Sequence, residues 1–469
     1  MKDINKEFTT EETWSTDTGG GAVSKARSNV ARALDVLSSF DNYNNPLRTS
    51  VLLTHLGISS STGFALIKAM LDVELLEKSS HGYIQLGPTA RRWIFTPFST
   101  RYLVLLKMRR LTNGSQKELR PFPLIPRAAL WNPDLVDTVN TEGFSSPGPY
   151  RISFSNASLS NYWRIALLRS MRYAVHSHGT NISAFNTICA EDNPEKQCDD
   201  IDTLMKRGTD ILLVSAVNSN NPQLIDKLQA VMNSGVPVVG VDRSPGDPSA
   251  MVSFVAASDV NIGRISAVWL AEHLQGKGRI WMLSGTKGTS PAIQREKAAR
   301  QVFSQFPDIH VEALMHTNWQ PEGGSAAVRS LLNKYPTPAD GIWCDSGLQG
   351  IGSIDTFVQD SLPIPPHTGG NLNFMYKLAI KQHVPFVALD YPAAMGAKAV
   401  ETGLDIKAGK TVLKKIETNV QVVIPRGFET LSIKADEWAE LHVRWQLSDD
   451  YVLSQGASLY WNDREYSHA

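Results

Sequence analysis

The chain has 469 residues, a formal net charge of zero, 42% hydrophobic and 20% charged residues. Such a composition is typical of a globular protein, and the length suits roughly three structural units. No apolar run approaches the ~18 residues that a membrane-spanning helix needs, which excludes a helical membrane protein. Residues 1–18 are polar and lack the apolar core of a secretory signal, so we expect a cytoplasmic location.

The chain contains three cysteines, Cys189, Cys198 and Cys344. They show neither C-x-x-C spacing nor nearby histidine pairs, so a zinc or redox role is the weaker interpretation. We expect buried or unreactive thiols, no metal and no cofactor.

Positive charge is concentrated near the start of the chain. Residues 24–127 contain 15 Lys or Arg but only 6 Asp or Glu, although the whole chain is neutral. This segregation favours an anionic partner for the first part of the chain.

Residues 1–23 have no apolar periodicity and predict a disordered leader. Helical patterns follow over 28–40 and 49–56, and a third begins within 58–62 and continues to Leu75. Gly57 supplies a stop between the last two helices. Two short strands, 75–78 and 83–86, are joined by a loop that ends in Gly82. This order predicts a winged helix-turn-helix over residues 24–95.

The stretches Arg32–Leu37, Leu56–Thr62 and Gly82–Pro88 resemble the IclR-type winged-helix repressor family. The predicted reader of double-stranded operator DNA combines hydroxyls at the start of the third helix with cations that face phosphates. The candidate residues are Arg27, Arg48, Ser59, Ser60, Ser61, Thr62, Lys68, Lys78 and His81. The alternative for each hydroxyl is a solvated helix cap, and for His81 an ordinary surface histidine.

Residues 96–149 contain six prolines within 121–149 and predict a linker, with a connecting helix over 102–108 as one option. From Tyr150 to about residue 430, short apolar strands alternate with amphipathic helices. This alternation predicts parallel sheets with helices on both faces, and its length suits two sheets. Beyond residue 431 we predict a helix over 435–447 and then an aromatic-rich stretch, which packs on the preceding domain or pairs subunits.

The segment Asp202–Asp242 resembles the type I periplasmic sugar-binding fold, which lactose-repressor-like regulators also use. Further matches in family order are Ala257–Gly263, Ser284–Ser290, Arg295–Lys297 and Met395–Glu401. The resemblance implies an α/β fold class in which a two-lobed sugar sensor, with two parallel sheets and flanking helices, covers residues 150–430.

In open α/β sheets, ligands lie beyond the carboxyl ends of the strands. That rule and the resemblance select Ser160, Tyr162, Trp163, Asp242, Arg243, Arg295, Asp345, Asn371 and Asp390 as ligand-binding candidates. Aromatic faces can stack on the C–H faces of a sugar, while carboxylates and guanidinium groups bind its hydroxyls. The alternatives are a surface ion pair for Asp242 and Arg243, a core position for Trp163 and a loop cap for Arg295.

The chain contains no G-x-x-x-x-G-K-[ST], H-E-x-x-H or G-x-S-x-G motif, so we expect no enzyme. The sequence favours a cytoplasmic, homodimeric transcription regulator whose DNA affinity responds to a sugar or polyol effector. The alternative is a solute-binding protein that delivers a sugar to an ABC transporter.

Overall fold

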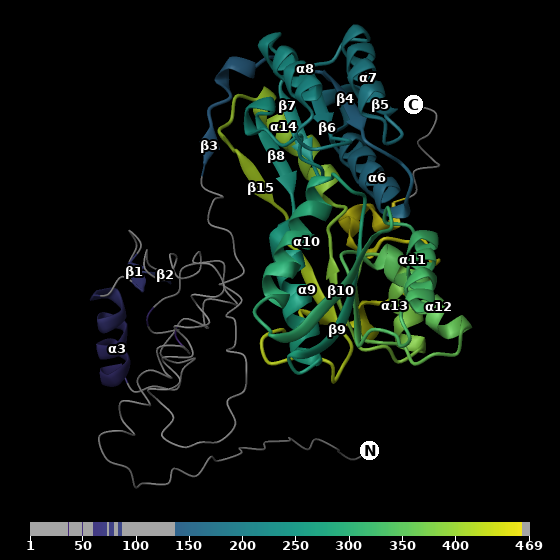
Figure 1. Ribbon diagram of the computed structural model, residues 1–469. Helices are drawn as coiled ribbons and strands as arrows, with labels where there is room; N and C mark the ends of the chain where they lie inside the picture. The colour runs from purple at the N-terminus through teal and green to yellow at the C-terminus, as the bar shows by residue number, and fades with distance from the viewer. Residues whose placement is uncertain are drawn as a thin grey trace, which may run out of the picture. The chain divides into compact units, whose positions relative to one another are not determined.

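The computed structural model describes residues 36, 49, 60–72, 75–78, 83–86 and 137–461 (Figure 1). The described residues up to 86 belong to one compact unit, and residues 137–461 belong to another. The predicted leader, the 102–108 helix and most of the first two predicted helices lie outside the described residues. So do four DNA-contact candidates: Arg27, Arg48, Ser59 and His81.

The N-terminal unit contains α3 (Ser60–Asp72) and a hairpin of β1 (Leu76–Lys78) and β2 (Ile84–Leu86). The strands pair antiparallel, with Glu77 opposite Gln85. A small core joins helix and hairpin through the buried side chains Val36, Ile67, Met70, Leu76 and Ile84. These elements stand where the third helix and the wing were predicted, and the complete winged helix-turn-helix stays a prediction.

The C-terminal unit has two lobes, each built on a mainly parallel sheet (Figure 1). Lobe 1 contains six parallel strands in the order β15-β8-β7-β6-β4-β5. Their bounds are β4 Tyr150–Asn156, β5 Ile182–Cys189, β6 Ile211–Val214, β7 Val238–Val241, β8 Ser253–Ala256 and β15 Lys415–Glu417. α6 (Tyr162–Ser177) packs with α14 (Met395–Lys407), while α7 (Pro194–Lys206) packs with α8 (Pro222–Asn233).

Lobe 2 contains seven strands in the order β10-β9-β11-β12-β13-β16-β17, parallel except where β13 meets β16. Their bounds are β9 Lys277–Ser284, β10 Asp308–His316, β11 Gly341–Cys344, β12 His367–Gly369, β13 Phe386–Asp390, β16 Gln421–Ile424 and β17 Glu437–Trp438. The helices of this lobe are α9 Asp259–His273, α10 Ser290–Phe303, α11 Pro321–Lys334, α12 Gly347–Gln359, α13 Asn373–Lys381 and α15 Ala439–His442. The two-lobed α/β fold with parallel sheets is therefore confirmed.

Smaller elements complete the unit. β3 (Thr138–Val139) pairs antiparallel with β14 (Val412–Leu413), so part of the predicted linker is built into lobe 1. The short 3-10 helices are η4 Glu142–Phe144, η5 Gly179–Asn181, η6 Pro248–Ala250 and η7 Leu453–Tyr460. The chain passes between the lobes after β8, after β13 and after β15. No helix among the described residues has the length and apolar character needed to cross a membrane.

The predicted helix over 435–447 was wrong. Glu437 and Trp438 instead form β17 beside β16, and only residues 439–442 are helical. After His442 the backbone leaves the helical conformation and binds to Asn373 of α13. The side-chain nitrogen of Asn373 donates to the carbonyls of Arg444 and Leu447. A tertiary partner therefore overrides the local helical pattern.

Two helices begin at a polar cap that also faces the space between the lobes. The side chain of Asn161 accepts a hydrogen bond from the backbone N–H of Arg164 at the start of α6. Ser346 accepts from the N–H of Leu348 at the start of α12. Such caps satisfy the free N–H groups of a first helical turn and fix the helix ends at the cleft.

Candidate functional site

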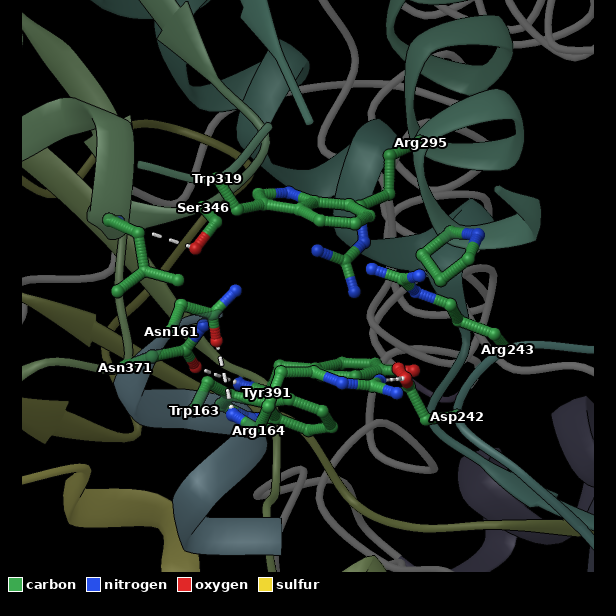
Figure 2. Close-up of a pocket in the computed structure, with 12 residues that line it drawn as sticks. Asn161, Trp163, Arg164, Asp242, Arg243, Arg295, Trp319, Ser346, Asn371 and Tyr391 are labelled. Atoms are coloured by element: carbon green, nitrogen blue, oxygen red, sulfur yellow. Dashed lines mark hydrogen bonds and ion pairs between the residues drawn. The ribbon is translucent and has the colours of Figure 1, made fainter. Parts of the chain in front are cut away.

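Twelve residues from both lobes line a pocket whose empty space, including its opening to solvent, is about 340 Å³ (Figure 2). They are Asn161, Trp163, Arg164, Asp242, Arg243, Pro291, Arg295, Trp319, Ser346, Leu348, Asn371 and Tyr391. Most stand just beyond a strand or in the first turns of the next helix, where α/β sheets place their ligands.

Three aromatic rings bound the pocket. Figure 2 shows the indole of Trp319 on one side of the space and the rings of Trp163 and Tyr391 on the opposite side. Trp163 and Tyr391 have ring centroids 5.1 Å apart, and the Trp163 indole N–H donates to the Tyr391 carbonyl at 3.0 Å. Two opposed apolar faces suit a flat ligand with C–H faces, such as a sugar ring.

Arg164 is a buried cation held within lobe 1. Its guanidinium forms a short ion pair with Asp242 and donates to Asn156 at 2.8 Å and to Ser215 at 3.0 Å. Burial, with the nearby charge of Arg243, lowers the pKa of Arg164 to about 10, so it remains charged at neutral pH. Its donors are largely occupied by protein, which makes Arg164 a rigid wall of the site.

Arg243 and Arg295 reach toward the space between the rings (Figure 2). Arg243 pairs with Asp192 at 3.0 Å and lies 5.4 Å from the Trp319 ring. Arg295 pairs with Asp259 at 2.7 Å and lies 4.4 Å from the Tyr391 ring. All three guanidinium groups of the pocket, counting Arg164, are therefore balanced by a carboxylate.

Burial acts in opposite directions on the two members of the Asp259–Arg295 pair in lobe 2. Burial raises the pKa of Asp259 to about 6, although the Arg295 charge opposes this rise. Burial lowers the pKa of Arg295, but Asp259, Tyr391 and Asp345 outweigh it and the net shift is upward. The pair is mainly ionised at neutral pH, and as the pH falls Asp259 takes up a proton at a higher pH than an ordinary aspartate does.

Three lining residues other than glycine have left-handed backbones: Asp242 with φ 63°, Trp319 with φ 53° and Asn371 with φ 79°. This region is sparsely populated by residues with a Cβ and tends to be found at functional sites. The backbone is held there by packing, which is consistent with a preorganised pocket.

The lobes touch at the rim of the pocket. The Gln320 side chain donates to the Ser160 carbonyl at 2.8 Å, and the backbone N–H of Ser244 donates to the Ser290 hydroxyl at 2.9 Å. The hydroxyl of Tyr391 is buried, and burial together with the nearby carboxylates of Asp259 and Asp242 raises its pKa well above its usual value. The hydroxyl is therefore neutral at physiological pH and can take part in hydrogen bonds at the pocket wall.

Of the nine ligand-binding candidates, five line the pocket: Trp163, Asp242, Arg243, Arg295 and Asn371. Ser160 contributes only its carbonyl to the rim, and its hydroxyl bonds to Ser158. Tyr162, the first residue of α6, is 48% exposed. The structure does not bring Ser160 or Tyr162 into the pocket, because the first turn of a helix points successive side chains in different directions.

Asp345 and Asp390 are also buried, but they lie behind the pocket. Asp345 accepts from the Trp319 indole N–H at 3.0 Å and from the Gly285 backbone at 3.0 Å. Asp390 accepts from the Asn371 backbone N–H at 2.8 Å. Because successive side chains near a strand end point to opposite sides, the next residues, Ser346 and Tyr391, face the pocket instead.

The sequence analysis missed seven lining residues: Asn161, Arg164, Pro291, Trp319, Ser346, Leu348 and Tyr391. Three of them, Asn161, Ser346 and Tyr391, directly follow a chosen candidate that does not line the pocket, so the prediction was one position away. Trp319 lies three residues beyond β10, so the rule that ligands lie beyond strand ends could have predicted it.

The structure holds no disulfide among Cys189, Cys198 and Cys344. Within the described ranges, no group of three or more His, Cys, Asp or Glu side chains is placed to hold a metal ion.

Comparisons with known proteins concern the two-lobed unit. A sequence profile of the periplasmic binding protein domain family matches residues 152–411. The ribose import binding protein of Bacillus subtilis is 22% identical over 276 residues, covering 58% of this chain and 87% of that protein. A xylitol-binding protein of Mycolicibacterium smegmatis is 26% identical over 165 residues, covering 35% of this chain and only 46% of that protein.

Solved structures show the same fold. An ABC transporter solute-binding protein from Bacillus halodurans, with bound myo-inositol, has a TM-score of 0.55 at 17% identity and covers 60% of this chain and 97% of its own. Another from Mycobacterium smegmatis, with bound glycerol, has a TM-score of 0.56 at 20% identity, covering 65% and 99%. At these identities the likeness concerns the fold alone.

Proposed function

The chain belongs to the periplasmic binding protein domain family, and on that premise we propose that it binds a sugar or polyol in the pocket between its lobes. The observation that carries the proposal is the balance of charge and ring faces around the pocket. Each of the three guanidinium groups already has a carboxylate partner, and the aromatic rings stand on opposite sides.

This balance discriminates between ligand classes. An anionic ligand would need cations without a carboxylate, whereas a neutral polyhydroxylated molecule can share the existing donors and acceptors. The names of two relatives, which bind ribose and xylitol, support the same class. Ligand contacts to both lobes would favour the closed arrangement by their differential affinity for it.

The experiment compares neutral and charged ligands on the full chain. We expect D-ribose, xylitol, myo-inositol or glycerol to raise the melting temperature in a saturable way, with calorimetric titration as confirmation. Ribose 5-phosphate serves as the charged comparison and should bind more weakly than D-ribose. A chain that binds the phosphate and none of the neutral compounds would contradict the proposal.

Two roles can use such a site. The relatives named above include an import binding protein, and the similar structures include solute-binding proteins of transporters, which supports delivery of the solute to a transporter. A second role, a homodimeric and cytoplasmic regulator of transcription, is favoured by one observation: the N-terminal unit pairs α3 with a hairpin, and Lys68 and Lys78 are exposed on these elements.

DNA binding separates the two roles. In the regulator, Lys68→Ala with Lys78→Ala should reduce the salt dependence of binding to duplex DNA by about 2 in slope, since each phosphate contact contributes ~0.9. Fluorescence anisotropy with and without ligand measures this. Lys206→Ala with Lys277→Ala, two exposed lysines of the C-terminal unit, is the matched control. No duplex binding by the wild type would leave the transport role.

A further inference from the structure

Residues 437–461 lie beyond the stretch that matches the family, yet they contact both lobes. β17 extends the lobe 2 sheet, and Leu372 and Val452 form a β-bridge. At the far end, the Trp461 carbonyl accepts a short hydrogen bond from Arg169 of α6, and the Trp461 ring lies 5.9 Å from that of Tyr173. We call residues 437–461 the C-terminal strap.

The strap bonds directly to the backbone of two pocket residues. The N–H of Leu453 donates to the Asn371 carbonyl at 3.1 Å, and the Ser454 hydroxyl donates to the Tyr391 carbonyl at 2.7 Å. The two pocket residues are also tied to each other, since the Tyr391 N–H donates to the Asn371 side-chain oxygen at 2.6 Å. These bonds hold the left-handed backbone of Asn371, which would otherwise be unfavourable.

A buried histidine of the strap fixes the carboxylate behind these residues. His442 Nε2 lies 2.7 Å from Asp390, and Nδ1 lies 2.8 Å from Glu437. Asp390 in turn accepts from the Asn371 backbone and from the Tyr376 hydroxyl. With a carboxylate at each ring nitrogen, both nitrogens donate, which is the bonding pattern of an imidazolium.

We propose that the C-terminal strap is part of the ligand site, and that His442 and Ser454 act as positioning residues that hold Asn371 and Tyr391 in their binding geometry. The inference rests on the proposed function. The strap lies beyond residue 411, where the family match ends, and its bonds to Asn371 and Tyr391 reach the lobe 2 side of the pocket.

The strap should also give ligand binding a dependence on pH. Burial lowers the pKa of His442, but Asp390 and Glu437 outweigh it and raise the pKa to about 9. The groups that face the imidazole are Asp390 from β13, Glu437 from β17 and the Tyr376 hydroxyl from α13, whose own pKa is raised well above its usual value by burial and by Asp390. Above pH 9 the neutral imidazole can donate to only one of the two carboxylates.

The test uses the full chain with His442→Gln and, as a milder variant, Ser454→Ala. The controls are His310→Gln, exposed on β10 at the opposite edge of the lobe 2 sheet, and Ser304→Ala, exposed after α10. Without ligand, hydrogen exchange should become faster in the segments 371–373 and 390–394 of both variants. Neither control should change there.

Affinity is measured for whichever of D-ribose, xylitol, myo-inositol and glycerol raises the melting temperature most. Both variants should lose roughly tenfold in affinity, a typical coupling within one hydrogen-bond network. The fall in wild-type affinity between pH 8 and 10 should be smaller in His442→Gln. A purely structural histidine would not change that profile.

The outcomes separate this inference from the proposed function. If the wild type binds none of the four compounds, the proposed function fails, and hydrogen exchange still decides whether the strap positions the two residues. If the wild type binds, while the variants keep wild-type affinity and exchange, the inference is wrong and the binding site stands. Should His442→Gln not fold, Ser454→Ala decides.

Discussion

In lobe 1 the charged side chains of the pocket make their hydrogen bonds and ion pairs within the lobe, as Arg164 does with Asp242, Asn156 and Ser215. In lobe 2, by contrast, Asn371 and its neighbour Tyr391 depend on a segment that joins the sheet much later in the chain. The charged groups of lobe 1 thus find their partners within that lobe, whereas Asn371 and Tyr391 are held by the C-terminal strap. The contrast teaches that similar sheets can support a site by different means.

The largest expected effect concerns the buried ion pair between Arg164 and Asp242 in lobe 1. Arg164→Met should lower the free energy of unfolding by about 3–5 kcal/mol, because it leaves the Asp242 carboxylate buried without its partner. Urea denaturation measures the change. The control is Arg151→Met, whose pair with Asp210 is 47% and 29% exposed and should contribute less than about 1 kcal/mol. Equal losses in both variants would mean that the buried pair does not stabilise lobe 1.

The second prediction concerns the lobe that the strap completes. The pKa of His442 is raised from 6.5 to about 9, so the folded state holds the proton more tightly than the unfolded chain. The protonated imidazole of His442 therefore stabilises the folded state by about 3 kcal/mol. This contribution is fully present below pH 6.5 and is lost as the pH rises through 9. Wild type should therefore lose more stability between pH 6.5 and 9.5 than His442→Gln does.

Denaturation curves at the two pH values measure this difference. His310→Gln should follow the wild type, since that side chain is exposed on β10. Parallel losses in wild type and His442→Gln would show that the imidazolium does not bind the strap to lobe 2.

The third prediction separates binding from stability in lobe 1. Arg243 is buried, but its partner Asp192 is 37% exposed and can be solvated when the cation is removed. Arg243→Ala should weaken sugar binding about 10- to 100-fold, as expected for lost charge-assisted hydrogen bonds, while the free energy of unfolding changes far less than in Arg164→Met. Calorimetric titration beside urea denaturation gives both quantities. An unchanged affinity would remove Arg243 from the site.

The sequence predicted parallel sheets covered by helices because the alternation of strand and helix is local, and each strand's apolar run is visible in its own residues. The resemblance to the type I periplasmic sugar-binding fold implied the two lobes. It also predicted Trp163, Asp242, Arg243, Arg295 and Asn371, which the structure places in the pocket. The strap was not predictable, because its effect depends on contacts such as that between His442 and Asp390, 52 residues apart. Likewise, the direction of a side chain at a strand end depends on where the pleat stops. For this reason the sequence could not show that Tyr391, and not Asp390, faces the pocket.

The smallest expected effect tests, on α6, whether the direction of a side chain decides its contact with the ligand. Tyr162 was chosen as a ligand contact beside Trp163, but its side chain is 48% exposed, whereas that of Trp163 lies in the pocket. Tyr162→Ala should change sugar affinity by less than about twofold, because it removes no contact with the pocket, and surface changes cost within about 0.5 kcal/mol. Trp163→Ala, one residue further, should abolish a stacking face and serves as the positive control. A loss of affinity in Tyr162→Ala equal to that in Trp163→Ala would mean that the ligand extends over the rim of lobe 1 and contacts residues outside the pocket lining.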